Sequence, residues 1–202
     1  MRNAFGFSPS FSLVLVASVP LLLAGCDVQR TSDAVAQEPG PEVPSPATGF
    51  DVHVTAPHVV NGEVMGPFHH YCKPISPEPI IQCILFETTE PDAPMTEVEY
   101  IVAKSVTRNQ IDRAQWNEAW HDHALEIASG RVKIHDMPEE DAAALAELVA
   151  TTDGLIFHMW PPGSEIPTGD VSIAQAVSHV ELDRSSWEQQ RMAATEAAAR
   201  GE

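Results

Sequence analysis

The folded part of the chain is expected to begin near Phe50, where short stretches with the pattern of β-strands follow one another. Residues 51–55 alternate apolar and polar side chains, which is typical of a strand with one buried face. Residues 97–102 alternate again and place Glu97 and Glu99 on the same face. Four more candidate strands are short runs bounded by turn residues: 80–86, 121–130, 155–160 and 171–180.

Three stretches have the pattern of helices. Residues 108–120 follow Thr107, whose hydroxyl suits a helix N-terminus, and carry apolar side chains at helical spacing. Residues 138–149 open with Pro138 and have acidic residues in the first turn, as helix starts often do. The third stretch, residues 187–200, is rich in alanine and mostly polar, which indicates a largely exposed helix.

Strands interspersed irregularly with helices predict the α+β class. We expect a single compact domain with a mainly antiparallel sheet and two or three helices. This domain is expected to span residues 50–182, followed by a C-terminal helix in residues 183–202. The turn-forming pair Asp153-Gly154 is expected to end the second helix.

The N-terminus has the composition of an export signal. The apolar run of residues 11–23 is shorter than a membrane span, which needs about 20 apolar residues. The run ends in Leu23-Ala-Gly-Cys26, which resembles the lipobox of bacterial lipoproteins. Small residues give a peptidase access to the backbone, and the cysteine thiol receives diacylglycerol. We therefore expect residues 1–25 to be removed as a lipoprotein signal peptide and Cys26 to carry the lipid that anchors the chain.

Residues 26–49 are expected to form the lipidated cysteine and a disordered tether. Four prolines lie between Gln37 and Gly49, and few apolar residues are available to form a core. The domain is then expected to belong to the cell envelope, where it would face the periplasm and be tied to a membrane through its lipid. Asp27 resembles a retention signal and favours the inner membrane.

The charge of the chain excludes one class of partner. The sequence has 29 Asp and Glu residues against 11 Lys and Arg residues, which gives a formal net charge of −18. Such a chain repels phosphate backbones and anionic lipid head groups. We therefore expect no nucleic-acid partner, and we expect contact with the membrane to depend on the lipid at Cys26.

Two cysteines remain in the predicted domain, Cys72 and Cys83. In an oxidising compartment such a pair can form a disulfide. Two buried thiols and a pair of metal ligands are the alternatives, and the spacing alone does not decide among the three.

A set of strings occurs in order along the chain: His69-His-Tyr-Cys72, Gln82-Cys83, Glu90-Pro-Asp-Ala93, Val98-Glu-Tyr-Ile-Val102, Trp120-His-Asp-His123 with Glu126, Ser129-Gly130 and His158-Met-Trp160. The set resembles the oil body-associated protein family, a family of unknown function first met in plant seeds and also found in microbes. The resemblance covers roughly residues 52–180. It implies a domain and no reaction, because the family has no established reaction.

The chain departs from this family in two ways. After Trp160 it is less polar than the family pattern, and its export signal differs from plant members, which lie on lipid droplets in the cytosol. A lipid-droplet function is therefore not carried over. The resemblance also bears on Cys72 and Cys83, because plant members keep this pair in a reducing compartment. It shifts the expectation towards free thiols that lie close enough for an oxidant to join them.

The histidines are the strongest chemical signal, because neutral imidazole is the commonest metal ligand in proteins. On a strand, His121 and His123 point to the same face. With Glu99 and a third histidine they would form an open site of the zinc or iron type. The string His121-x-His123 with Glu126 has a distant likeness to a cupin motif, but on a strand Glu126 would face the other way.

The sequence thus predicts a membrane-anchored lipoprotein that binds a small ligand or a divalent metal such as zinc or iron. The candidate metal ligands are His69, His70, His121, His123, His158 and Glu99. One alternative is a metal-dependent enzyme that uses five of them: His70, His121, His123, His158 and Glu99. The other is a structural or interaction protein of the envelope, in which the histidines only support the fold.

Overall fold

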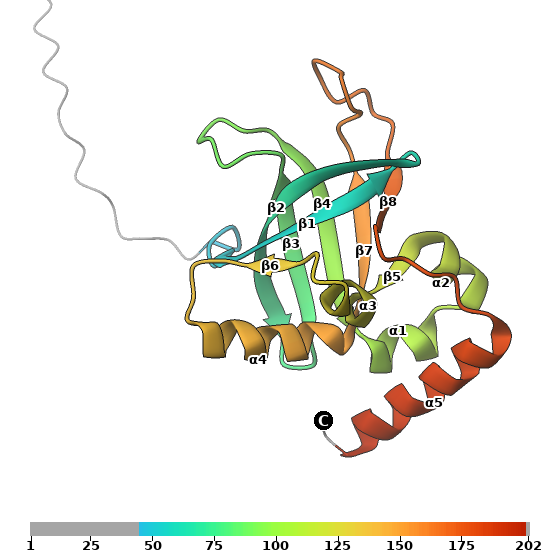
Figure 1. Cartoon of the computed structure of the whole chain (residues 1–202). Helices are drawn as coiled ribbons and strands as arrows, with labels where there is room; N and C mark the ends of the chain where they lie inside the picture. The colour runs from blue at the N-terminus through green and yellow to red at the C-terminus, as the bar shows by residue number, and fades with distance from the viewer. Residues whose placement is uncertain (1–44, 201–202) are drawn as a thin grey trace, which may run out of the picture. The chain divides into compact units, whose positions relative to one another are not determined.

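The computed structural model describes residues 45–200 of the chain (Figure 1). The predicted signal peptide, the predicted lipidation site at Cys26 and most of the predicted tether lie outside these residues. Within residues 45–200, no helix combines the length and apolar character needed to cross a membrane.

Six antiparallel strands close into a barrel (Figure 1). The ring is closed because β1 pairs with β2 along one edge and with β8 along the other. Around the barrel the order is β1, β2, β3, β4, β7 and β8. The bounds of these strands are Val52–Val60 for β1, Glu63–Ser76 for β2, Ile80–Phe86 for β3, Met95–Ala103 for β4, Thr152–His158 for β7 and Ser172–Ala176 for β8.

Two short strands are added to this ring. Strand β6 (Lys133–Ile134) pairs with β1, and strand β5 (Trp120–Asp122) pairs with β7. Along β7, residues 153–155 pair with β5, whereas residues 156–158 pair with β8. Strand β5 therefore occupies the part of the β7 edge that β8 leaves unpaired.

The helices gather at one end of the barrel, and the loops that follow β3 and β7 extend from the other end (Figure 1). Asp112 starts α2 by accepting hydrogen bonds from two backbone N–H groups of the first turn, and Asp122 starts α3 in the same way with one. The bounds of the helices are Lys104–Gln110 for α1, Arg113–Ala119 for α2, His123–Ala128 for α3, Glu139–Ala150 for α4 and Arg184–Arg200 for α5.

Two apolar clusters stabilise this arrangement. The first combines buried side chains of the barrel strands: Val60, Phe68, Cys72, Ile81, Cys83, Leu85, Ile101, Ile156 and Ala174. The second packs α2 and α5 against the barrel through three tryptophans and two aliphatic residues: Val102, Trp116, Trp120, Leu182 and Trp187. The compact domain with a mainly antiparallel sheet is confirmed, whereas residues 45–200 contain five helices where two or three were expected.

Cys72 and Cys83 form a disulfide, so the expectation of free thiols was wrong. The two residues face each other directly across β2 and β3, and their Cα atoms are 4.1 Å apart. This separation is typical of a pair without hydrogen bonds in an antiparallel ladder, where side chains lie closest. The resemblance to cytosolic plant proteins misled here, because the register of the strands brings the sulfur atoms together.

Three predicted elements need correction. The predicted strand 121–130 ends after Asp122, because this side chain caps α3. The predicted helix 108–120 is divided between two short helices, α1 and α2. Helix α1 ends at Gln110, and Asp112 caps the start of α2. Asp153-Gly154 does not end a helix but lies inside β7.

Candidate metal centre

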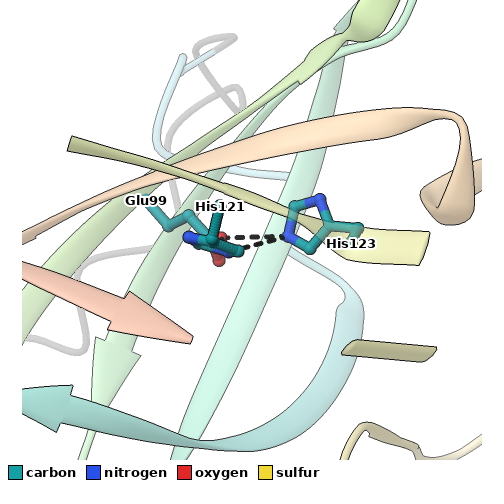
Figure 2. A group of neighbouring side chains, drawn as sticks. All are labelled: Glu99, His121 and His123. Carbon is teal, nitrogen blue, oxygen red and sulfur yellow. Dashed lines mark hydrogen bonds and ion pairs between the residues drawn. The ribbon is translucent and has the colours of Figure 1, made fainter. Parts of the chain in front are cut away.

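Three buried side chains meet inside the domain: Glu99, His121 and His123 (Figure 2). Glu99 belongs to β4, where Glu97, Glu99 and Ile101 alternate with exposed or half-buried residues and face the interior. His121 lies on β5, and His123 is the first residue of α3. The relative exposure of the three residues is 3%, 0% and 3%.

Their polar atoms form a nearly equilateral triangle. Nε2 of His121 lies 3.2 Å from Nε2 of His123. Oε1 of Glu99 lies 3.4 Å from Nε2 of His121 and 3.3 Å from Nε2 of His123. A tetrahedral ion about 2.0–2.1 Å from each donor requires donors about 3.3–3.4 Å apart. The triangle therefore has the size that one zinc-like ion needs.

Gly154 of β7 makes room for this triangle. A Cβ atom at Gly154 would lie 2.3 Å from Nε2 of His121 and 2.5 Å from Oε1 of Glu99. Gly154 pairs directly with His121 across β5 and β7. Any larger residue would thus displace two of the three donors, so the backbone of β7 forms one wall of the site.

A hydrogen bond orients the ring of His123. Thr152 donates its hydroxyl hydrogen to the carbonyl of Val149, at 2.6 Å. The same hydroxyl lies 2.9 Å from Nδ1 of His123 and must therefore accept a hydrogen from it. Neutral His123 then carries its hydrogen on Nδ1 and presents the lone pair of Nε2 to the triangle. Ligating histidines normally have such a partner. His121 does not, because its Nδ1 has no hydrogen-bond partner among residues 45–200.

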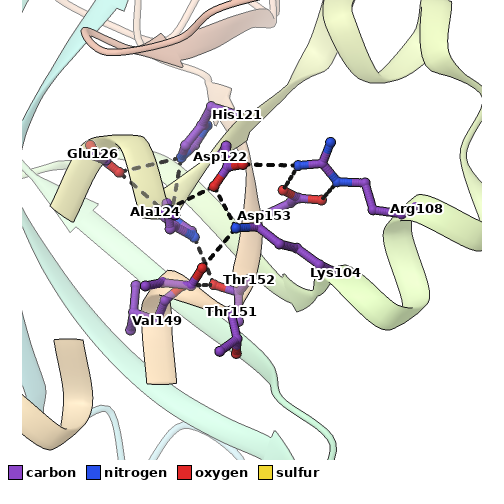
Figure 3. Close-up of polar contacts among 12 residues, drawn as sticks. Lys104, Arg108, His121, Asp122, Ala124, Glu126, Val149, Thr151, Thr152 and Asp153 are labelled. Carbon is purple, nitrogen blue, oxygen red and sulfur yellow. Dashed lines mark hydrogen bonds and ion pairs between the residues drawn. The ribbon is translucent and has the colours of Figure 1, made fainter. Parts of the chain in front are cut away.

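Glu126 is a further carboxylate at the site, and the prediction that it faces away was wrong. Its Oε2 lies 3.8 Å from Nε2 of both His121 and His123 (Figure 3). The cause is helical geometry, since His123 and Glu126 lie three residues apart on α3 and so share a face. Glu126 stands farther from the donors than they stand from one another.

Electrostatics favour the ionised form of Glu99. Burial disfavours the charge of Glu99, but hydrogen bonds with His121 and His123 outweigh it and hold the pKa of this carboxyl well below its ordinary value. Burial also disfavours a charged His123, yet the hydrogen bond and charge of Glu99 raise its pKa. The arrangement thus favours positive charge beside Glu99.

A second buried network lies next to the triangle and centres on Glu97. Its two oxygens accept hydrogen bonds of 2.7 Å from Nδ1 of His58 and Nδ1 of His158. His70 donates from Nδ1 to the carbonyl of Phe68, so its Nε2 is an acceptor and takes the hydrogen on Nε2 of His58, 3.1 Å away. His58 therefore carries hydrogens on both nitrogens and is an imidazolium.

The pKa shifts agree with this assignment. Burial and the neighbouring His58 lower the pKa of His70 to about 4. Burial opposes a charge on His58, but its hydrogen bond to Glu97 and the charge of that residue raise the pKa. For Glu97 burial is likewise outweighed by the hydrogen bonds from His158 and His58, which lower the pKa of the carboxyl.

The structure thus places the predicted ligands in three different environments. Glu99, His121 and His123 converge. His70 lies beside them, with Nε2 3.6 Å from Oε2 of Glu99. His158 bonds Glu97 instead, and its Nε2 has no hydrogen-bond partner in the described part of the chain. His69 is away from the site, because adjacent strand residues face opposite sides, and its Nδ1 lies 3.0 Å from Nε2 of His53. Sequence analysis did not single out His58, Glu97, Thr152 or Gly154 for the site.

A buried ionic network supports the segments that carry the ligands (Figure 3). Arg108 of α1 donates from Nε and Nη2 to the two oxygens of Asp153, at 2.9 and 2.7 Å. Asp153 precedes Gly154. Asp122, between the two histidines, lies 3.3 Å from Arg108 and 2.6 Å from Nζ of Lys104. The network therefore ties β5, β7 and α1 together at residues that adjoin His121, His123 and Gly154 in the sequence.

The fold and the site define a small α+β barrel domain with a buried histidine–carboxylate cluster. Residues 44–200 match the family described as Protein of unknown function (DUF1264), and the chain belongs to that family.

Curated relatives come from plants. Oil body-associated protein 1B of Arabidopsis thaliana is 28% identical over 112 residues, which cover 54% of this chain and 45% of the relative. Oil body-associated protein 2C of the same plant is 27% identical over 128 residues, or 61% of this chain and 53% of the relative. The chain thus spans about half the length of the curated relatives it matches. No solved structure matches the chain.

Proposed function

We propose that this protein binds one divalent transition metal ion, best fitted by zinc, through Glu99, His121 and His123. The observation that carries the proposal is the triangle of donor atoms, whose sides of 3.2 to 3.4 Å suit tetrahedral zinc. Six-coordinate iron also uses two histidines and a carboxylate, but neighbouring ligands about 2.1–2.2 Å from the ion would lie about 3.0 Å apart. The sides of 3.2 to 3.4 Å lie nearer to the zinc spacing.

The supply of hydrogens supports the same proposal. Histidines ligate a metal in the neutral form and release any extra proton when the ion binds. With His121 and His123 both neutral, Nε2 of His123 presents a lone pair and Glu99 is an acceptor, so a single hydrogen is available for three polar atoms. Buried acceptors without donors cost free energy. An ion at the centre of the triangle satisfies all three atoms at once, and Gly154 leaves the room that they need.

Metal analysis of the purified full chain tests this proposal. After dialysis we expect about one zinc ion per chain, since three protein ligands and a water form a complete site. The double variant His121→Ala/His123→Ala should lose the ion. The matched control His53→Ala/His69→Ala removes two histidines that bond each other outside the triangle and should keep it. Equal metal content in both double variants, or none in the unmodified chain, would overturn the proposal.

A metal-dependent enzyme is the second candidate, and the position of Glu126 favours it. Three protein ligands leave a fourth position for water, which is the pattern of catalytic zinc sites. Glu126 lies 3.8 Å from both histidine donors, where a carboxylate can exchange a proton with a molecule bound to the ion. An enzyme should lose turnover in Glu126→Gln while it retains the metal, whereas a purely structural ion predicts no turnover to lose.

We also propose that the domain is held at a membrane by lipid on Cys26, facing the periplasm. The support is the sequence alone: the apolar run and the Leu-Ala-Gly-Cys string before a proline-rich stretch. Mass spectrometry of the mature N-terminus tests it. The expected result is a mature chain that begins with a diacylated Cys26. The Cys26→Ser variant should either keep its signal peptide or be released from the membrane. An unmodified cysteine within a longer mature chain would contradict the anchor.

A further inference from the structure

A small cavity adjoins the candidate metal centre. One side is formed by polar residues of both buried networks, among them Glu99, His123 and Glu126. The other side is apolar and is formed by side chains of β1, β6 and α4, such as Val54, Ile134, Leu145 and Val149. The cavity therefore joins a set of metal donors to an apolar wall.

The cavity borders the triangle at two of its three donors, because Glu99 and His123 line it. Gly154 closes another side of the triangle, because its backbone lies against His121 and Glu99. A fourth ligand of the ion can therefore reach it from the cavity, where it meets Glu126 as well as the apolar residues.

The size of the cavity limits the ligand. Its volume is about 40 Å³. A single water needs about 10–15 Å³ of such a cavity, so roughly three to four groups of that size fit. A ligand of about four non-hydrogen atoms fills the space, and a longer one requires α4 to move away.

The charge around the cavity selects an uncharged ligand. Two acidic residues, Glu99 and Glu126, line the cavity beside the proposed ion. No lysine or arginine lines the cavity among residues 45–200. An anionic ligand would add a buried charge without a partner, which is costly in an apolar environment.

We propose that the fourth position of the metal takes a short uncharged molecule with one oxygen donor for the ion, one N–H or O–H group for Glu126, and a small apolar body. Short alcohols and short primary amides share this chemistry. The inference rests on the proposed metal site and adds the class of ligand that this site accepts.

The test uses the full chain loaded with Co²⁺, whose visible absorption reports a change of ligand at the open position. Acetamide and acetate are nearly equal in shape and differ in charge, so they form a matched pair of probes. We expect acetamide to shift the cobalt absorption at concentrations about tenfold or more below acetate, because acetate brings an unpaired charge. Hexanamide should bind more weakly than acetamide, since its chain exceeds the cavity.

A pair of variants on one helix locates the binding. Leu145 of α4 lines the cavity, whereas Leu148 of the same helix does not line it and is 45% exposed. Leu145→Trp should keep the cobalt and lose the response to acetamide, and Leu148→Trp should keep both.

The outcomes separate the two proposals. A chain that binds no metal overturns the metal site and this inference together. A cobalt-loaded chain that prefers acetate, or binds hexanamide as tightly as acetamide, overturns only the class of ligand. A response to acetamide that survives in Leu145→Trp overturns the cavity as its location.

Discussion

Gly154 lies directly opposite His121 across β5 and β7, and a Cβ atom there would stand 2.3 Å from the Nε2 atom of the histidine. The smallest side chain that any substitution can add would therefore occupy the place of the imidazole. The metal proposal thus depends on a residue that binds nothing itself.

Gly154→Ala should weaken metal binding by about tenfold to a hundredfold, because the displaced donors cost about 1–3 kcal/mol. Competition with a metal indicator measures the change. Gly62→Ala is the control, since its Cβ meets nothing within 4 Å while its φ of +85° still strains the backbone. Equal effects on metal affinity in the two variants would show that Gly154 acts through stability alone.

Thr152→Val should lower metal affinity about 10- to 100-fold, because it removes the acceptor that holds the ring of His123. The matched control is Thr96→Val. Thr96 is equally buried, but its hydroxyl has no hydrogen-bond partner within residues 45–200, so its loss leaves the site unchanged. Titration with zinc distinguishes the two, and equal affinities would contradict the orienting role of Thr152.

Glu97→Gln should lower the free energy of unfolding by about 3 kcal/mol, because it leaves His58 buried without its anion. The pH dependence has two limits. Because folding lowers the pKa of Glu97, its contribution to the free energy of unfolding is fully present above the ordinary carboxyl pKa. This contribution is lost as the pH falls through the pKa of Glu97 in the folded protein.

Because folding raises the pKa of His58, its contribution to the free energy of unfolding is fully present below the ordinary imidazole pKa. This contribution is lost as the pH rises through the pKa of His58 in the folded protein. Denaturant unfolding of both proteins should show the largest difference in mild acid, between the ordinary carboxyl pKa of 4.5 and the ordinary imidazole pKa of 6.5. A difference that does not vary with pH would contradict the ion pair.

Arg108→Met should destabilise the fold by about 3–5 kcal/mol, because Asp153 would remain buried without its ionic partner and Asp122 would keep only Lys104. The guanidinium also packs against Trp116, 4.2 Å from the ring centre. Arg191→Met removes an exposed pair with Glu188 and should cost less than about 1 kcal/mol. Chemical denaturation compares them, and similar losses would contradict the buried network.

The donors could be predicted from sequence because their positions follow from local periodicity. Alternation in residues 97–102 placed Glu97 and Glu99 on one face, and that face is the interior. His121 and His123 were expected together for the wrong reason. A strand was assumed to continue past them, whereas α3 begins at His123, and the helix is what brings Glu126 into the site.

The barrel itself could not be predicted, because it depends on pairing between distant segments. Strand β2 was missed entirely. Its prolines and neighbouring histidines obscure the two-residue period, although Phe68, His70 and Cys72 alternate inward as in any strand. The contribution of Gly154 was hidden for a related reason. Asp-Gly is a common turn signal. Only the register of β5 against β7 shows that Gly154, which has no side chain, leaves room for His121.

The burial of the three donors also governs how fast an ion can leave. None of them is more than 3% exposed, and the adjoining cavity of about 40 Å³ is too small for a multidentate chelator, so such a chelator cannot reach a bound ion directly. Release has to wait for a local opening of the domain, and such openings occur at a rate that belongs to the protein. The rate of metal loss should therefore stay constant as the chelator concentration is raised, and the ion is retained by the slowness of this opening as well as by its affinity.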